Sequence, residues 1–437
     1  MLESVNKKQY PKILVISNNS FSKTSNNGKT LASFFKKFPS ENIAQLYFSS
    51  EIPNEDSYKN YYRISDSQVL KSLITFASAG SKVRADINKE SFLYGEAPGK
   101  SKPDYIKKSD FNRLLRELMW KSKKWMSNEL INWLNDFSPD IVFFCAGDTG
   151  FAYDIVSYVL DKTDAKLITY ITDDYVLPRR TASTLWRWRR NIIFKKMNRT
   201  IFRSDLFITI SEQMRKTYKD LFKKNSIVAL NMTESMKIEN FTSKEQDSNI
   251  IKLIYAGGLH FKRYETLSLL AEAIDRYNQK SLVKKAYLSI YSTGKPSEKV
   301  LEKVNIKGSS KFLGGLSSEE LKVKLNEADI PVHVESFDPR CIESTRLSIS
   351  TKIPEYLSLG KPILAIGPEE VASMKFLTNV AYCICDKNTI SNEITKLFNE
   401  KILQEELKKK AYSTYLDKYS IESLGKLTQS IIDLNYQ

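Results

Sequence analysis

The sequence predicts an α/β protein with two doubly wound parallel sheets, each in its own domain. Short apolar runs that suit buried parallel strands alternate with amphipathic segments of helical length. The chain has 437 residues, too many for one typical domain. A polar, aperiodic stretch over 232–249 separates two series of this alternation. We therefore expect a first domain over 1–235, a second over 250–415, and a last helix over 416–437 that packs back on the first domain.

In the first half, a polar loop follows the first strand, and its Asn26-Asn27-Gly28 turn precedes a helix that begins near Thr30. One long amphipathic helix is predicted over Phe111–Phe137, and weak periodicity over 57–108 indicates an irregular insertion. The apolar side of the long helix consists of Leu114, Leu115, Leu118, Trp125, Leu130 and Trp133. Buried strands are predicted at Lys12–Ser17, Asp140–Cys145, Lys166–Ile171 and Leu206–Ser211.

The second half repeats the pattern, with predicted helices over Tyr264–Tyr277 and Ser318–Glu327. A last amphipathic helix carries Ile421, Leu424, Leu427, Ile431 and Leu434. Strands are predicted at Lys252–Ala256, Ala286–Tyr291, Lys311–Leu313, Ile363–Ile366 and Ala381–Cys385.

Composition excludes several classes of protein. Four cysteines without a C-x-x-C pair and only two histidines argue against a disulfide framework and against a Cys/His zinc site. The N-terminus lacks the apolar core of a signal peptide, and no apolar run approaches the ~20 residues that span a bilayer. We expect a cytoplasmic protein. The net charge of +16 fits nucleic acid, anionic lipid or phosphate-bearing substrates, or a lysine-rich solvated surface.

The stretch from Ser350 to Gly367 forms one unit. Ser350 and Thr351 are good helix N-caps, a short apolar helix follows, and Gly360 ends it before a buried strand. The helix start and Lys352 together make an anion site, and Glu355 can accept hydrogen bonds from ligand hydroxyls. The alternative is an ordinary capped helix.

A second loop suits phosphate. Gly257 and Gly258 follow a predicted strand and allow close backbone approach to a ligand, and Lys262 and Arg263 add cations at the next helix start. A Gly-Gly pair alone is a weak signal.

Carboxylates follow two predicted strands of the first domain. Asp148 and the pair Asp173-Asp174 could orient a sugar hydroxyl or act as a base, or could simply cap helices. The letters Gly28-Lys29-Thr30 do not form a phosphate-binding P-loop, because Lys23 occupies the position of its first glycine.

The segment 179–203 has nine Lys/Arg and no acidic residue, with Trp186 and Trp188 interleaved. This mixture is typical of a helix at an anionic membrane surface, and basic-aromatic mixtures also bind single-stranded nucleic acid. The third reading is that the apolar residues pack on the sheet and the arginines are solvated. We expect core packing with a membrane-facing side.

The segment Thr351–Pro362, T-K-I-P-E-Y-L-S-L-G-K-P, resembles the donor-binding segment of GT-B glycosyltransferases, particularly retaining bacterial enzymes similar to glycosyltransferase family four. The resemblance implies two Rossmann-like domains facing a central cleft. It places the nucleotide ribose at Glu355 and the donor sugar at Glu335. It places the nucleotide base near Gly314. It places the diphosphate at Gly257, Gly258, Lys262, Arg263, Thr351 and Lys352.

One departure from the family pattern concerns its paired glutamates. Glu335 and Glu343 have the family spacing, yet the Tyr-Leu and Gly-Lys-Pro context follows Glu355. We therefore give the ribose-binding role to Glu355 and treat 338–349 as an insertion.

The resemblance implies a glycosyltransferase of the hexosyltransferase class. It would move a sugar from a nucleotide sugar, UDP-linked in the first instance, to a saccharide or lipid-linked acceptor in capsule or other cell-surface polysaccharide synthesis. The expected catalytic residues are Asp173, Asp174, Lys262, Arg263 and Glu335, and the acceptor-side residues are Asn27, Gly28, Asp148 and Asp173.

No D-x-D motif occurs, so metal-independent transfer without a cofactor is expected. The resemblance implies that the anomeric configuration is retained. The expected location is the cytoplasm, peripherally on the inner membrane face, and no nucleic-acid partner is expected. The alternatives are a non-transferring relative, either a sugar-nucleotide epimerase or an inactive scaffold subunit, and a nucleic-acid-binding protein explained by charge alone.

Overall fold

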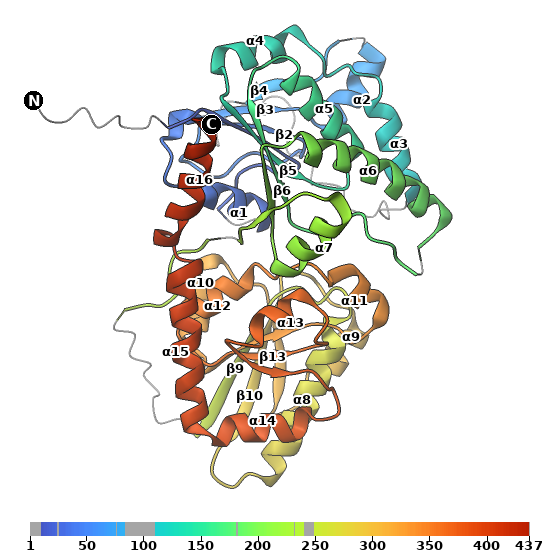
Figure 1. The fold of residues 1–437 in the computed structure, drawn as a ribbon. Helices are drawn as coiled ribbons and strands as arrows, with labels where there is room; N and C mark the ends of the chain where they lie inside the picture. Colours follow the sequence, from blue (N-terminus) through green and yellow to red (C-terminus); the bar gives the residue numbers. More distant parts are fainter. Residues whose placement is uncertain are drawn as a thin grey trace, which may run out of the picture. The chain divides into compact units, whose positions relative to one another are not determined.

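The computed structural model describes residues 10–23, 26–75, 77–83, 110–180, 182–230, 232–239 and 249–436 (Figure 1). Two compact units make up the chain. The first consists of Met1–Ala229 with Gly425–Gln437, and the second of Leu230–Leu424.

The first unit is built on an eight-stranded sheet in the order β4-β3-β2-β1-β5-β6-β7-β8. All neighbours in it pair parallel except β3 and β4. The strands are β1 (Ile13–Ser17), β2 (Ile43–Tyr47), β3 (Asn60–Arg63), β4 (Ser81–Val83), β5 (Ile141–Ala146), β6 (Lys166–Ile171), β7 (Leu206–Thr209) and β8 (Ile227–Val228). The predicted strands coincide with β1, β5, β6 and β7.

Helices flank this sheet, and the last of them comes from the end of the chain. They are α1 (Asn26–Phe34), α2 (Asp66–Thr75), α3 (Asp110–Trp120), α4 (Asn128–Phe137), α5 (Gly150–Leu160), α6 (Thr184–Arg203), α7 (Glu212–Phe222) and α16 (Gly425–Asn435). Lys166 Nζ donates to the Leu434 carbonyl at 2.7 Å, which ties α16 to β6.

The single helix predicted over Phe111–Phe137 is wrong, because two helices occupy this segment. Lys123 has a φ of 57°, a left-handed conformation that no helix interior accommodates. Ser127 then caps α4, since its hydroxyl accepts a hydrogen bond from Leu130 N at 3.1 Å. Trp125, expected on the helix, is buried in the turn between the two helices.

Helix α3 also has its apolar side reversed. Leu115 and Leu118, expected in the core, are 49% and 58% exposed. The polar side of α3 faces inward instead: Arg113 binds Asp148, and Glu117 accepts hydrogen bonds from the first backbone N–H groups of α5.

Helix α1 begins four residues before the predicted start, so Asn27 and Gly28 lie in its first turn. A Cβ on Gly28 would lie 2.2 Å from the Ser20 carbonyl oxygen, so only glycine allows this approach of helix and loop. Of the insertion expected over 57–108, residue 76 and the segment 84–108 lie outside the described residues. The described remainder includes β3, α2 and β4.

The second unit has a six-stranded parallel sheet in the order β11-β10-β9-β12-β13-β14. Its strands are β9 (Ile250–Ala256), β10 (Lys285–Tyr291), β11 (Ser310–Gly314), β12 (Ile330–Val334), β13 (Leu364–Ile366) and β14 (Tyr382–Ile384). Fully buried Leu253, Leu288 and Val332 form its core with α8 (Arg263–Lys280) and α14 (Ile390–Asn399).

The remaining helices of this unit are α9 (Glu298–Val304), α10 (Ser318–Glu327), α11 (Pro339–Thr345), α12 (Lys352–Ser358), α13 (Ala372–Leu377) and α15 (Lys401–Lys418). Helix α11 lies in the segment that the sequence marks as an insertion.

The boundaries of the units differ from the predicted ones at two points. Residues 232–239 pack on the second unit, where Met236 N donates to Ser358 Oγ at 2.9 Å and Ile238 N donates to Asn326 Oδ1 at 3.1 Å. The second unit therefore begins at Leu230 rather than at 250. At the other end α15 continues to Lys418, and the segment that rejoins the first unit starts at Gly425.

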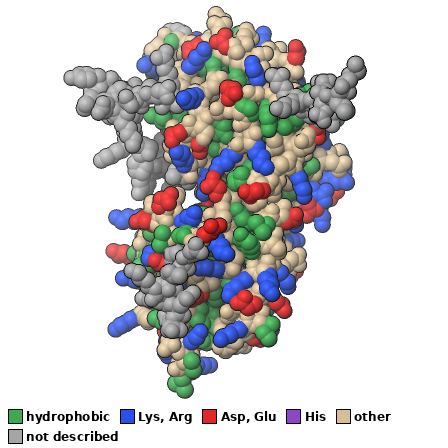
Figure 2. All heavy atoms as spheres, turned by 90° about the vertical axis from the view of Figure 1, so that its left-hand side faces the viewer, with side chains coloured by type: hydrophobic (Ala, Val, Ile, Leu, Met, Phe, Trp, Pro, Cys, Tyr) green, Lys and Arg blue, Asp and Glu red, His purple; other side chains and the backbone are tan. Residues whose placement is uncertain are grey.

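None of the helices in the described part of the chain is both long and apolar enough to cross a bilayer. On the face drawn in Figure 2, Lys and Arg side chains are interspersed with Asp and Glu side chains.

Candidate functional site

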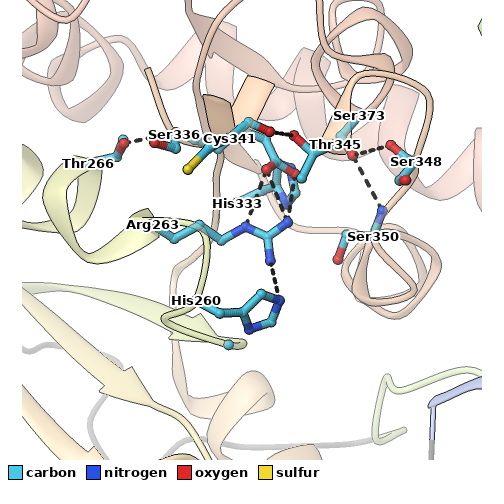
Figure 3. A network of polar contacts seen from close by, with 12 residues as sticks. His260, Arg263, Thr266, His333, Ser336, Cys341, Thr345, Ser348, Ser350 and Ser373 are labelled. Atoms are coloured by element: carbon cyan, nitrogen blue, oxygen red, sulfur yellow. Dashed lines mark hydrogen bonds and ion pairs between the residues drawn. The ribbon is translucent and has the colours of Figure 1, made fainter. Parts of the chain in front are cut away.

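The candidate site centres on an ion pair in the second unit between Arg263, the first residue of α8, and Glu335, the residue after β12. Arg263 Nε lies 3.2 Å from Glu335 Oε2, and Nη2 lies 3.1 and 3.0 Å from the two carboxylate oxygens. Figure 3 shows the Arg263 guanidinium beside His260, whose Nε2 lies 3.5 Å from Nη1. Glu335 is 2% exposed, so an arginine with planar donors is the suitable partner for its charge.

Four further residues surround Glu335, namely Thr266, Ile366, Gly367 and His333. Thr266 Oγ1 donates to the Glu335 carbonyl oxygen at 2.8 Å, and the Glu335 N–H donates to Ile366 O at 2.8 Å. A Cβ on Gly367 would lie 2.8 Å from the Glu335 Cβ, so the backbone after β13 approaches closely only because residue 367 is glycine. Buried His333 places Nε2 3.3 Å from Glu335 Oε1, without the geometry of a hydrogen bond.

The electrostatics favour an ionised Glu335. Burial raises the pKa of this carboxyl, but the neighbouring His333 and Arg263 outweigh burial, and the net pKa lies below its ordinary value. The pKa of Arg263 is raised: its burial acts in the opposite direction, and the Glu335 charge outweighs it. The site therefore holds a buried ion pair rather than two neutral groups.

The turn before α8 carries the glycine pair. Phe261 and Lys262 both have a φ of 54°, and Lys262 is the residue before the first helical turn. Lys262 Nζ lies 2.6 Å from Asp338 Oδ2. That carboxylate also caps α11, where it accepts hydrogen bonds from the N–H groups of Arg340 and Cys341.

Gly257 and Gly258 make this turn narrow. A Cβ on Gly258 would meet the His260 ring at 2.3 Å, and a Cβ on Gly257 would meet the Tyr255 hydroxyl at 2.8 Å. The Tyr255 hydroxyl donates to Gly258 O at 2.7 Å and holds the loop against β9.

Helix α12 carries the third predicted cation. Lys352 Nζ lies 3.0 Å from Glu355 Oε2, and Glu355 is 4% exposed. At the helix start the Ser350 hydroxyl accepts a hydrogen bond from Lys352 N at 3.3 Å, whereas Thr351 makes no capping bond through its side chain. Thr351 therefore occupies the N-cap position without a capping bond from its side chain, and the Ser350 hydroxyl accepts the hydrogen bond from the helix start instead.

Two contacts that sequence reasoning missed hold α12 in place. Ser373 on α13 accepts a hydrogen bond from Ser350 N and donates to Ser348 O (Figure 3). The Tyr356 hydroxyl accepts a hydrogen bond from Ala256 N at 3.2 Å, which links α12 to the residue before the glycine pair. Tyr356 lies in the Glu-Tyr-Leu part of the motif, but the apolar pattern of this segment does not indicate a bond from its hydroxyl.

The segment Gly360-Lys361-Pro362 has a structural role here. Lys361 Nζ donates to the carbonyls of Leu325, Asn326 and Ala328, which lie at the C-terminal end of α10. Burial lowers the pKa of Lys361 to about 8. Gly314, predicted near a nucleotide base, ends β11 with a φ of 87°, which favours glycine.

The predicted residues of the first unit have other partners. Asp148 lies 2.6 Å from Arg113 and 3.3 Å from Arg189 and so belongs to an ion-pair network. Asp174 is 3% exposed, and its Oδ1 accepts hydrogen bonds from Val176 N and Leu177 N. Those bonds hold the loop after β6, and because α6 begins only at Thr184, Asp174 supports a loop rather than capping a helix. Asp173 is half-buried with the Tyr175 hydroxyl 3.5 Å away.

A cavity of about 280 Å³ in the second unit lies apart from these groups. Strands β9 and β10 and helix α10 line it, with Lys252, Tyr287, Ser289 and Lys324 among its residues. None of the predicted site residues contributes to it. Within the described residues, no group of three or more His, Cys, Asp and Glu side chains is placed to hold a metal ion.

No protein-family model and no curated protein sequence matches this chain. Solved structures do match it over nearly its whole length. HepE of Anabaena, solved with UDP and glucose, has a TM-score of 0.62 at 11% identity over 97% of this chain and 99% of its own. A trehalose-6-phosphate protein of E. coli, solved with UDP-2-fluoro glucose, has a TM-score of 0.62 at 10% identity, covering 97% of this chain and 99% of its own.

A glycosyltransferase of Rickettsia africae has a TM-score of 0.58 at 13% identity, covering 98% of this chain and 100% of its own. At such identities the likeness concerns the fold. Two units with parallel sheets, matched end to end by these structures, show that the chain has the GT-B fold.

Proposed function

We propose that this protein transfers a sugar from a nucleoside-diphosphate sugar to an acceptor hydroxyl and that its second unit binds the donor. The observation that carries the proposal is the convergence of Lys262, Arg263 and Glu335 beside the glycine pair, which Tyr356 joins to the Lys352–Glu355 helix. A diphosphate needs cations and free backbone N–H groups, and a sugar needs a carboxylate partner for its hydroxyls.

Each residue has a part in this proposal. Gly257 and Gly258 let the backbone approach the diphosphate, and Lys262, Arg263 and Lys352 with Thr351 take up its charge. Glu355 binds the ribose, Glu335 faces the donor sugar, and Gly314 lies near the base. UDP is the first base to test, because HepE was solved with UDP and with UDP-glucose.

The reaction breaks the bond between the anomeric carbon and the diphosphate oxygen, and the electron pair remains on that oxygen. The acceptor hydroxyl oxygen forms the new bond to the anomeric carbon, and its proton passes to the departing diphosphate. Charge on the leaving group grows as the bond breaks, so cations fixed beside it lower the barrier. Three or four charge-assisted bonds of ~1.5–3 kcal/mol each are enough for several decades in rate. We propose that no metal is needed, that the anomeric configuration is retained, and that the enzyme is a hexosyltransferase.

On the acceptor side, we assign Asp173 to orient the acceptor hydroxyl, with Asn27, Gly28 and Asp148 on the same unit. Asp174 supports the loop that carries Asp173. The acceptor we propose is a saccharide or a lipid-linked saccharide at an anionic membrane surface, as in capsule or other cell-surface polysaccharide synthesis. The basic helix α6 supports this choice, since its 20 residues include seven Lys/Arg and no acidic side chain.

The test is calorimetric titration with UDP, GDP and ADP in EDTA. We expect one nucleotide to bind and Glu355→Ala to abolish that binding. Failure of all three to bind would remove the donor site and favour an inactive scaffold. Binding without transfer to any acceptor, together with conversion of the nucleotide sugar alone, would identify an epimerase.

A further inference from the structure

Helix α3 presents its apolar side to the outside of the first unit. The three exposed residues of this helix are all apolar: Phe111 is 61%, Leu115 49% and Leu118 58% exposed. Their spacing of four and three residues aligns them on one stripe of the helix. Among the residues that the structure describes, core packing therefore does not account for the apolar side of α3.

The opposite, charged side of α3 is locked inward. Arg116 Nε lies 2.8 Å from both carboxylate oxygens of Asp66, and the Trp120 indole donates to the same carboxylate at 2.7 Å. Glu117 accepts hydrogen bonds from Gly150 N and Phe151 N at the start of α5. Rotation of α3 to bury its apolar stripe would break all of these contacts, so the outward stripe is a built feature.

Helix α2 lies beside α3, joined by the Asp66–Arg116 pair, and exposes a second stripe. Leu70 is 54%, Leu73 39% and Ile74 74% exposed. We call the six side chains together the α2–α3 apolar face, namely Leu70, Leu73, Ile74, Phe111, Leu115 and Leu118. Neighbouring helices that each expose an apolar stripe are typical of an interaction surface.

Lysines border this face, and the half-exposed Asp66 on α2 is paired with Arg116. The exposed residues of α2 and α3 include Lys71 and no acidic side chain, and exposed Lys121 and Lys123 follow the end of α3. Ser183 Oγ donates to Asp110 Oδ2 at 2.8 Å, which places the start of α6 beside the start of α3. Trp188 on α6 is 56% exposed.

We propose that the α2–α3 apolar face rests on an anionic lipid bilayer, with its six apolar side chains at the acyl boundary and the surrounding cations at lipid phosphates. Outward apolar stripes bordered by Lys, Arg and Trp are the signature of helices that lie in the membrane interface. A second copy of the chain fits less well, because a symmetric dimer through this face would bring the same cations together.

This inference extends the membrane part of the proposed function and locates it. It moves the contact from α6 alone to α2 and α3, with α6 as the basic border. Helix α6 itself turns Ile193, Met197 and Ile201 into the core, so its apolar content is largely used within the unit.

The experiment is co-sedimentation of the full chain with vesicles of phosphatidylcholine alone and with one quarter phosphatidylglycerol. We expect binding to the anionic vesicles only, and at least tenfold weaker binding for Leu115→Glu/Leu118→Glu. The matched control is Leu282→Glu/Ile402→Glu in the second unit, two sites that are 97% and 80% exposed. This control adds the same two charges and should bind like wild type.

Three outcomes would overturn the inference: no binding of wild type to anionic vesicles, equal loss in the control, or unchanged binding of Leu115→Glu/Leu118→Glu. Sedimentation velocity without lipid tests a fourth such outcome. If wild type is a dimer and Leu115→Glu/Leu118→Glu is a monomer, this face is a contact between two copies of the chain. Thermal unfolding verifies that Leu115→Glu/Leu118→Glu folds. If this variant does not fold, Leu70→Ser/Ile74→Ser takes its place in the binding experiment. UDP titration without vesicles tests the donor site separately, so failure of the proposed function can be distinguished from failure of the membrane inference.

Discussion

The Tyr356 hydroxyl accepts a hydrogen bond from Ala256 N at 3.2 Å, although the two residues are 100 positions apart. Ala256 immediately precedes Gly257 and Gly258, and Tyr356 immediately follows Glu355. One buried hydroxyl therefore sets the distance between the two segments that we assign to the diphosphate and to the ribose.

Replacing Tyr356 with phenylalanine should loosen this link without leaving a large cavity. Ala256 N would lose a buried partner, which costs about 1–3 kcal/mol of unfolding free energy. We expect that loss in denaturant titrations and a weaker UDP affinity by calorimetry. Tyr287→Phe, on β10 and at the cavity to which no predicted site residue contributes, is the matched control. Unchanged affinity in Tyr356→Phe would show that the two segments do not act together.

Glu335→Gln should separate binding from chemistry. The amide keeps the shape of the side chain but removes the charge that Arg263 now faces, so Arg263 becomes a stronger partner for a diphosphate. We expect UDP affinity to be unchanged or higher and turnover to fall by two decades or more. Glu343→Gln, at the alternative glutamate of the family spacing, should leave both quantities near wild type. The reverse result would move the sugar-facing role to Glu343.

Stability should decline in acid through the same carboxylate. The folded-state pKa of Glu335 lies below its ordinary value of 4.5, because His333 and Arg263 outweigh burial. The unfolded chain therefore binds the proton first, and the stabilisation is present above pH 4.5 and lost as the pH falls through the folded value. Unfolding free energies measured between pH 7 and pH 3 should fall less steeply below 4.5 in Glu335→Gln than in wild type. Parallel curves would contradict this assignment.

Lys352→Ala should reduce turnover by two or more decades, equivalent to about 2.7 kcal/mol of barrier. The substitution also deprives buried Glu355 of the ammonium 3.0 Å away, which lowers stability. The double variant Lys352→Ala/Glu355→Gln should recover part of the stability but none of the activity. Turnover at the wild-type rate in Lys352→Ala would exclude Lys352 from the stabilisation of the leaving group.

The sequence predicted the fold because buried parallel strands are short apolar runs that few other elements resemble. Lys166–Ile171 and Ser318–Glu327 have the predicted bounds in the structure. The sequence does not predict strand β2, because Gln45 interrupts its apolar pattern. The Gln45 amide is buried and accepts a hydrogen bond from Phe21 N. A polar residue with a buried partner has no signature in the sequence.

The reversed α3 has a related cause. Periodicity defines two sides of a helix, but the inward side depends on partners far along the chain, here Asp66 and Asp148. Local motifs predict the individual site residues, but they do not predict which of these side chains contact one another. Nothing in the spacing of Arg263 and Glu335, or of Lys262 and Asp338, indicates that these side chains meet. His333 and Gly367 gave no motif at all.

Replacement of the adjacent Asp173 and Asp174 by alanine should affect different properties, turnover for Asp173 and stability for Asp174. Asp174 is buried and accepts two backbone hydrogen bonds, at 3.1 Å from Val176 N and 2.9 Å from Leu177 N. Its loss leaves both donors unpaired, and we expect about 2–4 kcal/mol lower unfolding free energy. Asp173→Ala should leave stability within about 0.5 kcal/mol and lower turnover, through a weaker hold on the acceptor. Equal stability losses would make both carboxylates structural, and full activity in Asp173→Ala would leave the acceptor hydroxyl to another residue.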